Sequence, residues 1–212
     1  MKVGGETLIA IIGAGGHAKC VYECFYLQGK KVLGFFDDNH DKVGLEVIDS
    51  LKVLGSAKDV LNYSEVDAVF IAIGDNCKRL EKYAYFKQNG YNFSNAVHGE
   101  VYISSFANIG QGNFLMGRAV VNPGAQIGDY CIINTSATVG HDCILENGVQ
   151  IGPGVNLAGG SILKEGVFVG IGAKVGPEVK IGAWATVGAG AVVLDDLPAN
   201  SFCCGVPAKP LK

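Results

Sequence analysis

The sequence predicts an α/β domain over residues 1–95, followed by a parallel β-helix over residues 96–212. The first observation is a strict rhythm, because between residues 97 and 193 an aliphatic residue returns every six positions. The second is that a small or β-branched residue stands four positions after most of these aliphatic residues. The third is a change of pattern near residue 95, before which apolar strands alternate with helices.

The six-residue period is typical of neither helices, which repeat near 3.6 residues, nor ordinary strands, which repeat near 2. A coiled parallel β-helix explains it, because each hexapeptide then supplies one short strand and one turn. The aliphatic residue points into a shared core, and the glycine that often follows it marks a tight turn. The aliphatic series is Val97, Ile103, Ile109, Leu115, Val121, Ile127, Ile133, Val139, Leu145, Ile151, Leu157, Leu163, Val169, Val175, Ile181, Val187 and Val193.

Charge and cysteine content exclude several classes of protein. The formal net charge is −3, with 17 basic and 20 acidic side chains interspersed, so we expect no nucleic-acid partner. The sequence shows neither a leader pattern nor an apolar run near twenty residues, so we expect no membrane partner and a cytoplasmic protein. Seven cysteines without a CxxC pair are typical of cytosolic thiols, not of disulfides or a zinc site.

The first domain reads as a small Rossmann-like βαβαβ sheet. Strands are predicted over residues 8–12, 31–36 and 67–73. Helices are predicted from the glycine-rich turn at 13–18 to about residue 28, over 56–61, and over 76–89. Strands that alternate with helices form a parallel sheet, whose carboxyl ends carry the binding loops.

The glycine-rich turn satisfies the loose form of the dinucleotide fingerprint. Gly13 and Gly15 are followed by the small Ala18, and the acids Asp37 and Asp38 stand about twenty residues further on. A backbone without a Cβ can approach a phosphate at a helix N-terminus. A dinucleotide needs a second βαβαβ half, but the hexapeptide repeat begins where that half would lie. We therefore expect a mononucleotide-sized ligand, and a tight turn without any ligand stays the alternative.

Three motifs together with the repeat resemble a known family over nearly the full chain. They are Ile-Ile-Gly-Ala-Gly-Gly-His-Ala-Lys at 11–19, Phe-Asp-Asp at 36–38 and Ile-Gly-Asp-Asn at 73–76. The family is that of the hexapeptide-repeat nucleotide-sugar acetyltransferases, which includes bacillosamine and perosamine N-acetyltransferases and is related to sialic acid O-acetyltransferases. The resemblance implies a left-handed β-helix with three hexapeptides per coil, assembled as a homotrimer.

The same resemblance implies that the first domain binds the nucleotide of a nucleotide-linked sugar. Residues near the phosphates would be Gly15, Gly16 and His17. Residues around the base and ribose would be Asp37, Asp38, Gly74, Asp75 and Asn76. Lys78 and Arg79 begin the next predicted helix, where they either direct charge toward the phosphates or lie on a solvated face.

His141 is the candidate general base. It stands where neighbouring hexapeptides carry Gly, Pro or Ala, and residues 133–143 resemble the catalytic coil of the N-acetyltransferases. Amine attack on a thioester requires loss of a proton, which an imidazole accepts at neutral pH. Asp142 would orient the imidazole if the pair lies at a corner of the coil, because adjacent side chains on a flat strand point to opposite faces. Otherwise Asp142 serves the turn, and a structural histidine is the competing interpretation.

Acetyl-CoA is the expected co-substrate, and no metal is expected. Backbone amides of a glycine-rich turn can stabilise the tetrahedral oxyanion, and residues 157–160 stand one coil beyond His141. The resemblance places Gly159 along the pantetheine arm, the tail with Pro207 and Lys209 near the adenine, and the rest of the groove along Ala173, Lys174, Ala189 and Gly190. Lys174 and Lys209 are the candidates for the cofactor phosphates. Zinc enzymes with this repeat need three converging histidines, but beyond His98 the repeat offers only His141.

The predicted function is acetyl-CoA-dependent N-acetylation of the 4-amino group of a UDP- or GDP-linked amino-sugar, for surface glycan biosynthesis. Two alternatives stay open: O-acetylation of a sugar of the sialic acid type, and a scaffold that binds a nucleotide-sugar without catalysis. A nicotinamide-dependent oxidoreductase is disfavoured because the second nucleotide-binding half is missing.

Overall fold

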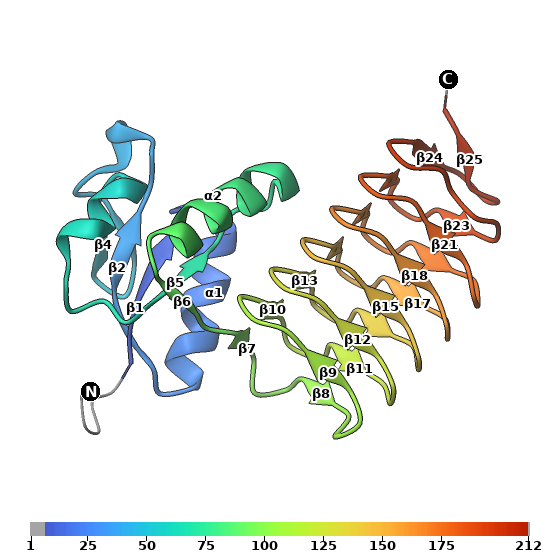
Figure 1. The fold of residues 1–212 in the computed structure, drawn as a ribbon, viewed down its shortest axis with the longest axis horizontal. Helices are drawn as coiled ribbons and strands as arrows, with labels where there is room; N and C mark the ends of the chain where they lie inside the picture. Colours follow the sequence, from blue (N-terminus) through green and yellow to red (C-terminus); the bar gives the residue numbers. More distant parts are fainter. Residues whose placement is uncertain (1–6, 212) are drawn as a thin grey trace. The chain divides into compact units, whose positions relative to one another are not determined.

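The structure is a computed structural model that describes residues 7–211. The chain forms two compact units, the first ending at Gly99 and the second beginning at Glu100 (Figure 1). Among the described residues, no helix is long and apolar enough to span a bilayer.

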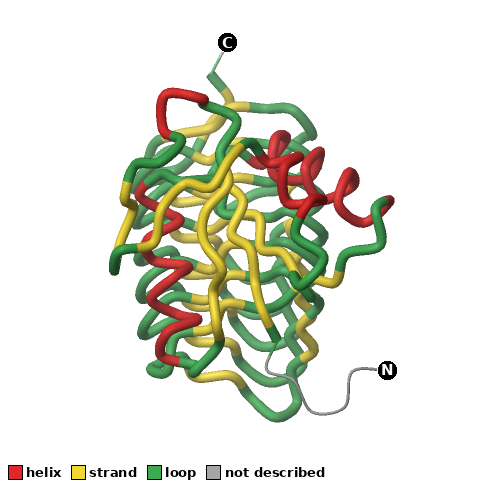
Figure 2. Tube along the Cα trace, turned by 90° about the vertical axis from the view of Figure 1, so that its left-hand side faces the viewer, coloured by secondary structure: helices red, strands yellow, loops and turns green. Residues whose placement is uncertain are grey.

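The first unit contains a six-stranded sheet with the order β3-β4-β2-β1-β5-β6. The central strand β1 is parallel to β2 and β5, whereas β3 and β4 pair antiparallel. In Figure 2 the strands of this sheet run side by side, with helices on either side. The strands are β1 (Leu8–Ile12), β2 (Lys31–Phe36), β3 (Glu46–Ile48), β4 (Leu51–Gly55), β5 (Ala68–Ile71) and β6 (Asn92–Phe93). The helices are α1 (Gly16–Leu27), α2 (Asn76–Gln88) and the 3₁₀ helices η1 (His40–Lys42) and η2 (Ala57–Asn62).

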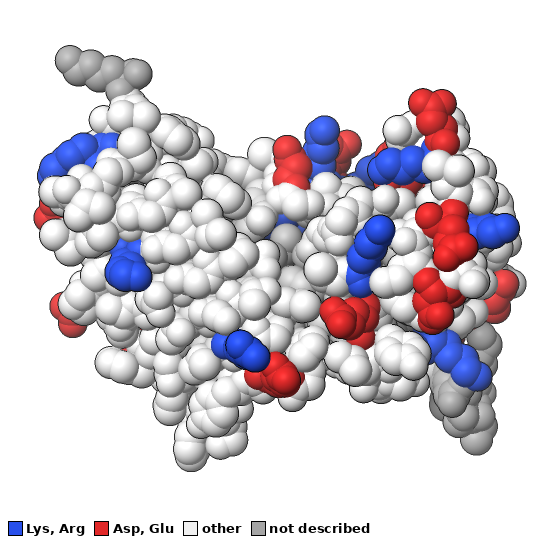
Figure 3. Space-filling model, turned by 180° about the vertical axis from the view of Figure 1, so that it is seen from behind, with Lys and Arg blue, Asp and Glu red and all other residues white. Residues whose placement is uncertain are grey.

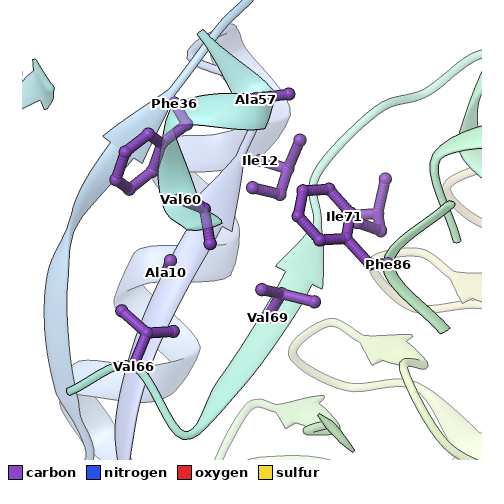
Figure 4. Packing of buried hydrophobic residues seen from close by; sticks show 9 residues of the cluster. All are labelled: Ala10, Ile12, Phe36, Ala57, Val60, Val66, Val69, Ile71 and Phe86. Atoms are coloured by element: carbon purple, nitrogen blue, oxygen red, sulfur yellow. The ribbon is translucent and has the colours of Figure 1, made fainter. Parts of the chain in front are cut away.

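Both faces of this sheet are covered, which explains why its central strands are continuously apolar. On one face, Phe25 of α1 meets Phe70 of β5 edge to face, with ring centroids 5.6 Å apart. On the other face, a cluster joins the strands to η2 and α2, as Figure 4 shows. Its buried members are Ala10, Ile12, Phe36, Ala57, Val60, Val66, Val69, Ile71 and Phe86.

Most predicted elements of the first unit are present, with two differences. Residues 57–62 form a 3₁₀ helix rather than an α-helix, held by a capping box between Ser56 and Asp59. The hairpin of β3 and β4 was not predicted. Its turn residues Asp49 and Ser50 both have positive φ, 52° and 62°, a conformation that hairpin sequences usually signal with glycine.

The second unit is a stack of coils, each made of three hexapeptides. Each strand from β8 to β20 pairs in parallel with the strand 18 residues later, for example Val121 with Val139 and Val139 with Leu157. Near the C-terminus the spacing shortens, because Val187 pairs with Cys203. One face contains β8 (Tyr102–Ile103), β11 (Val120–Val121), β14 (Thr138–Val139), β17 (Asn156–Leu157), β20 (Lys174–Val175) and β23 (Val192–Val193). The next contains β9 (Asn108–Ile109), β12 (Gln126–Ile127), β15 (Ile144–Leu145), β18 (Ile162–Leu163) and β21 (Lys180–Ile181).

The third face contains β10 (Phe114–Leu115), β13 (Ile132–Ile133), β16 (Gln150–Ile151), β19 (Phe168–Val169), β22 (Thr186–Val187), β24 (Phe202–Cys204) and β25 (Lys209–Pro210). The strand β7 (Ala96–Val97) belongs to the first unit. The aliphatic residues of the repeat fill the core, because each one from Leu115 to Val193 is at most 4% exposed. Ile103, in the first coil of the stack, is 36% exposed. The period of six therefore predicted the core correctly from Leu115 onward, whereas the first three members of the series, Val97, Ile103 and Ile109, are not buried. Charges of both signs are scattered over the face seen in Figure 3.

Two kinds of glycine shape the corners, which refines the prediction that the glycine after each aliphatic residue makes the turn. The left-handed residue stands three positions after the aliphatic residue, as Gly124 does at φ 75°. The glycine directly after the aliphatic residue serves close approach between coils instead. A Cβ at Gly140, for example, would lie 2.7 Å from the carbonyl oxygen of Leu157.

Candidate functional site

The glycine-rich turn of the first unit joins β1 to α1. Gly13 has φ 106°, and a Cβ there would lie 2.7 Å from the carbonyl oxygen of Ala72, so the turn requires glycine. Gly15 is the N-cap of α1, and Gly16 is its first residue. A Cβ on Gly15 or Gly16 would meet no atom within 4 Å, so open space surrounds this end of the helix.

Asp37 accepts a hydrogen bond from the glycine-rich turn, at which a ligand was predicted. Its Oδ2 accepts from the amide of Ala14 and from Nζ of Lys42, both at 2.8 Å, and its Oδ1 accepts from the amide of Asn39 at 2.9 Å. Burial raises the pKa of Asp37, but these hydrogen bonds and the charge of Lys42 outweigh it and hold the pKa below its usual value. Asp37 therefore connects the end of β2 to the glycine-rich turn.

Asp38 is bonded on both sides as well. Its Oδ2 accepts from Nζ of Lys82 on α2, and its Oδ1 accepts from the amide of Ala57 at 3.0 Å. The hydrogen bond from Lys82 lowers the pKa of Asp38, and burial opposes that shift without cancelling it. The carboxylate remains half exposed, at 54%.

A cavity of about 430 Å³ lies between these two carboxylates and α2. Its volume is in the range of small-molecule sites. Its lining combines apolar side chains with charges of both signs. The lining residues are Ile12, Gly13, Phe36, Asp37, Asp38, Ala57, Ile73, Lys78, Glu81 and Lys82. Of the predicted substrate-binding residues, the structure brings Asp37 and Asp38 together at this cavity.

The loop of Gly74, Asp75 and Asn76 is held by hydrogen bonds. Asp75 is the N-cap of α2, and its Oδ1 accepts from the amide of Lys78 at 2.9 Å. Asn76 is the first residue of the helix, and its Oδ1 accepts from Nη2 of Arg79 at 2.8 Å. None of these three residues lines the 430 Å³ cavity.

Arg79 does not lie on a solvated face, which was one of its two predicted positions. Its side chain is 2% exposed, and Nη1 donates to the carbonyl oxygens of Ile73 and Gly74 at 3.0 and 3.2 Å. The guanidinium reaches back from the first turn of α2 and holds the preceding loop. The sequence carried no signal for this role, because a cation in the first helical turn usually faces water.

His17 lies in the first turn of α1, near Arg79. Burial and the positive charge of Arg79 lower the pKa of His17 to about 4. At neutral pH the imidazole is therefore uncharged. If it meets a phosphate, it contributes a hydrogen bond and not a positive charge.

In the second unit, His141 and Asp142 lie at the corner between β14 and β15. Nδ1 of His141 is 2.8 Å from Oδ2 of Asp142. Asp142 has φ 58°, and this left-handed conformation lets two adjacent side chains face one another. The corner that the pairing requires is thus present. Both side chains are open to solvent in the single chain, 70% and 72% exposed.

The next coil places bare backbone against the imidazole. A Cβ on Gly159 would come within 3.0 Å of Cε1 and Nε2 of His141, so the ring occupies the space that glycine leaves. The amide of Gly160 donates to the carbonyl oxygen of His141 at 2.9 Å. That amide is already engaged, which leaves the Gly159 amide as the candidate oxyanion donor of this turn.

Five of the seven predicted cofactor residues lie on or beside the face that contains β14, β17, β20 and β23, whereas Lys209 belongs to β25 of the third face. Lys174 points outward from β20 and is exposed, whereas Ala173 is fully buried and offers no side-chain surface. Ala189 and Gly190 are exposed at the corner before β23, on the opposite edge of this face from Gly159. In the tail, Pro207 is exposed, and Nζ of Lys209 lies 3.6 Å from Oδ2 of Asp195.

Two further observations bear on this unit. A larger cavity of about 590 Å³ lies along β9, β12 and β15 and does not include His141. In the part of the chain that the structure describes, no group of three or more His, Cys, Asp or Glu side chains is placed to hold a metal ion.

Two family models match the chain. The PglD N-terminal domain matches residues 8–86, and the bacterial transferase hexapeptide model of six repeats matches residues 106–141, 125–159 and 160–195. Among curated proteins, the uncharacterized protein L142 of Acanthamoeba polyphaga mimivirus is 32% identical over 124 residues. The matched region is 58% of this chain, and the chain spans only 24% of the length of that viral protein.

Solved structures match nearly the whole chain. The H141N mutant of perosamine N-acetyltransferase from Caulobacter crescentus, in complex with CoA and GDP-perosamine, is 37% identical with a TM-score of 0.92, over 99% of this chain and 98% of that one. The acetyltransferase domain of PglB from Neisseria gonorrhoeae, in complex with acetyl coenzyme A, is 34% identical with a TM-score of 0.90, over 98% and 100% of the chains.

WeeI from Acinetobacter baumannii is 27% identical, with a TM-score of 0.85 over 97% of this chain and 100% of that one. Together with the parallel strands of both units, these matches confirm the predicted fold class, an α/β domain followed by a left-handed β-helix of hexapeptide repeats.

Proposed function

We propose that the chain transfers an acetyl group from acetyl-CoA to the 4-amino group of a nucleotide-linked amino-sugar, because it belongs to the hexapeptide-repeat nucleotide-sugar acetyltransferases. The observation that carries the proposal is the similarity over nearly the full length to an N-acetyltransferase in complex with CoA and GDP-perosamine. The His141–Asp142 pair against Gly159 supports it, because this corner supplies the base that the reaction needs.

The first domain, residues 1–95, would bind the nucleotide. The 430 Å³ cavity offers an apolar wall for a base, together with Asp37 and Asp38 as hydrogen-bond acceptors. The open space at Gly15 and Gly16 admits phosphates at the start of α1. Asp37 serves this site mainly by fixing the turn, since its oxygens already accept three hydrogen bonds.

The second domain, residues 96–212, would perform the transfer. With Asp142 ionised, the hydrogen bond between the side chains requires the proton on Nδ1 of His141, which leaves Nε2 as the acceptor. The amine attacks the thioester carbonyl, Nε2 takes the proton from nitrogen, and the C–S bond breaks as the amide forms. The proton then passes to the departing CoA sulfur, and the Gly159 amide faces the oxyanion.

The acetyl-CoA groove would run across the face of β17 and β20, from Gly159 past Lys174 to Ala189 and Gly190. In one chain this face is open, and the dyad is about 70% exposed. We propose that neighbouring copies in a homotrimer close the groove, because transfer to an amine rather than to water needs a sheltered thioester. We also propose cytoplasmic action on a precursor of a surface glycan, and the seven free cysteines fit a reducing compartment.

The test is an acceptor panel. The protein is mixed with acetyl-CoA and with UDP- or GDP-linked sugars that carry either a 4-amino or a 4-hydroxyl group, and thiol release is followed. We expect release with amino-sugars alone, lost by about 100-fold or more in His141→Asn and kept in the control His40→Asn, whose side chain is exposed. Release with hydroxy-sugars alone would instead show an O-acetyltransferase. No release with any acceptor, together with nucleotide-sugar binding, would show a scaffold.

A further inference from the structure

The His141–Asp142 pair lies between two glycines, one in the coil before it and one in the coil after it. Successive coils stack residues 18 positions apart, so Gly124 stands under Asp142 and Gly159 stands over His141. A Cβ on Gly124 would come within 3.0 Å of Oδ1 of Asp142. The space that Asp142 occupies therefore exists because residue 124 has no side chain.

The backbone around Gly124 also supports Asp142. The amide of Asp142 donates to the carbonyl oxygen of Pro123 at 3.1 Å, which fixes the height of the corner above the preceding coil. With the corner at that height, the carboxylate has Oδ1 toward Gly124 and Oδ2 toward Nδ1 of His141, at 2.8 Å. A methyl group at residue 124 would push the carboxylate away from the imidazole.

We propose that Gly124 is a positioning residue for acetyl transfer, which seats the Asp142 carboxylate so that it holds the His141 imidazole with Nε2 free. The inference rests on the function proposed above. It adds a residue that touches neither substrate nor the reacting atoms and acts only through Asp142. The left-handed backbone at residue 124 would favour glycine there even if Asp142 did not need the space. The experiment must therefore separate the backbone requirement of the turn from the space that the Asp142 carboxylate occupies.

The chain provides a matched control for the turn. Gly154 has φ 67° at an equivalent turn position of another corner, but a Cβ there would meet no atom within 4 Å. Both Gly124→Ala and Gly154→Ala therefore strain the turn backbone, but only Gly124→Ala places a Cβ against another side chain. We expect Gly124→Ala to lower kcat by about tenfold or more, with each KM within about twofold of wild type. We expect Gly154→Ala to change kcat by less than about twofold. Equal effects of the two substitutions would overturn the proposal.

A double-mutant cycle tests whether Gly124 acts through Asp142. In an Asp142→Ala background there is no carboxylate to displace, so adding Gly124→Ala should lower kcat by less than about twofold. A full loss in that background would overturn the proposal. Gly124→Asn guards against a variant that does not fold, because Asn adopts the left-handed conformation more readily and carries the same Cβ. We expect it to lower kcat as Gly124→Ala does.

A spectroscopic measurement separates this proposal from the proposed function. In protein with ¹⁵N-labelled histidine and no substrate, the His141 signals of wild type and Gly154→Ala should show the proton on Nδ1. In Gly124→Ala they should show the mixed tautomers of an unrestrained imidazole. Unchanged signals in Gly124→Ala would overturn the positioning role. Suppose that wild type shows the Nδ1 proton, that Gly124→Ala loses it, and that wild type acetylates no acceptor in the panel. The acetyltransferase proposal then fails, but Gly124 still positions the Asp142 carboxylate against His141.

Discussion

The guanidinium of Arg79 donates to the side chain of Asn76, with Nη2 and Oδ1 2.8 Å apart, inside the first turn of α2. The same guanidinium holds the carbonyl oxygens of Ile73 and Gly74. One buried cation thus fixes the loop between β5 and α2, whose residues were expected to contact the nucleotide.

Arg79→Met should destabilise the first domain by about 1–3 kcal/mol, because it leaves two partly buried carbonyl oxygens without their donor. It should also raise the KM for the nucleotide-sugar, while the KM for acetyl-CoA stays the same. Urea unfolding and steady-state kinetics measure the two effects. Lys78→Met, one residue earlier in the helix, is the control for loss of a charge. If both variants lost stability equally, the buried hydrogen bonds would not explain the loss.

His17 should make stability depend on pH. Its pKa is about 4 in the folded protein, against about 6.5 when unfolded, so the unfolded chain takes up the proton first as the pH falls. The stabilisation is complete above about pH 6.5 and is lost between pH 6.5 and 4, up to about 3 kcal/mol. His17→Gln removes this dependence. Urea melts of both proteins between pH 4 and 7 should separate toward the acid end, where wild type loses stability that His17→Gln keeps, and parallel curves would contradict the assignment.

Asp37 should stabilise the glycine-rich turn at neutral pH and lose that effect in acid. Its folded pKa is lowered, so the unfolded chain binds the proton first, and the stabilisation disappears below about pH 3.9. We expect Asp37→Asn to be less stable than wild type at pH 7, with a difference that shrinks toward pH 3. A difference that stayed constant with pH would show that the carboxylate charge is not what holds the turn.

Gly166→Ala should move the indole of Trp184, the chain's single tryptophan. A Cβ on Gly166 would come within 3.0 Å of the indole ring, which lies over that glycine. Displacing a packed ring costs about 1–3 kcal/mol, and its fluorescence should shift to longer wavelength. Gly154→Ala, with the same turn strain and an open Cβ position, should leave the emission unchanged.

Leu163→Ala should cost about 2–5 kcal/mol, because it opens a cavity among the stacked aliphatic residues. Leu163 is 0% exposed, whereas Ile103 occupies the same repeat position in the first coil and is 36% exposed. We therefore expect Ile103→Ala to cost clearly less. Thermal unfolding of the two variants provides the comparison. Equal losses of stability would show that the middle coils are packed no more tightly than the first coil.

The sequence predicted the β-helix well, because a period of six records the inward direction of every aliphatic residue, such as Val139 and Leu157. It also singled out His141, since a histidine followed by an acid replaces the small residues of neighbouring hexapeptides, but it left open whether the pair lies at a corner. It did not show that Arg79 is buried, because a cation that reaches back to its own loop leaves no spacing signal. Nor did it show the hairpin at Asp49 and Ser50, whose turn lacks the usual glycine.

The 18-residue register has a consequence for how such chains change length during evolution. Inserting one residue within a strand would turn the aliphatic residue after it outward, whereas duplicating a whole coil preserves each vertical column of side chains. Gains and losses that keep these columns intact should therefore come in multiples of eighteen. The corner of His141 can therefore keep Gly124 and Gly159 as its neighbours while coils are added to or lost from the C-terminal end of the stack.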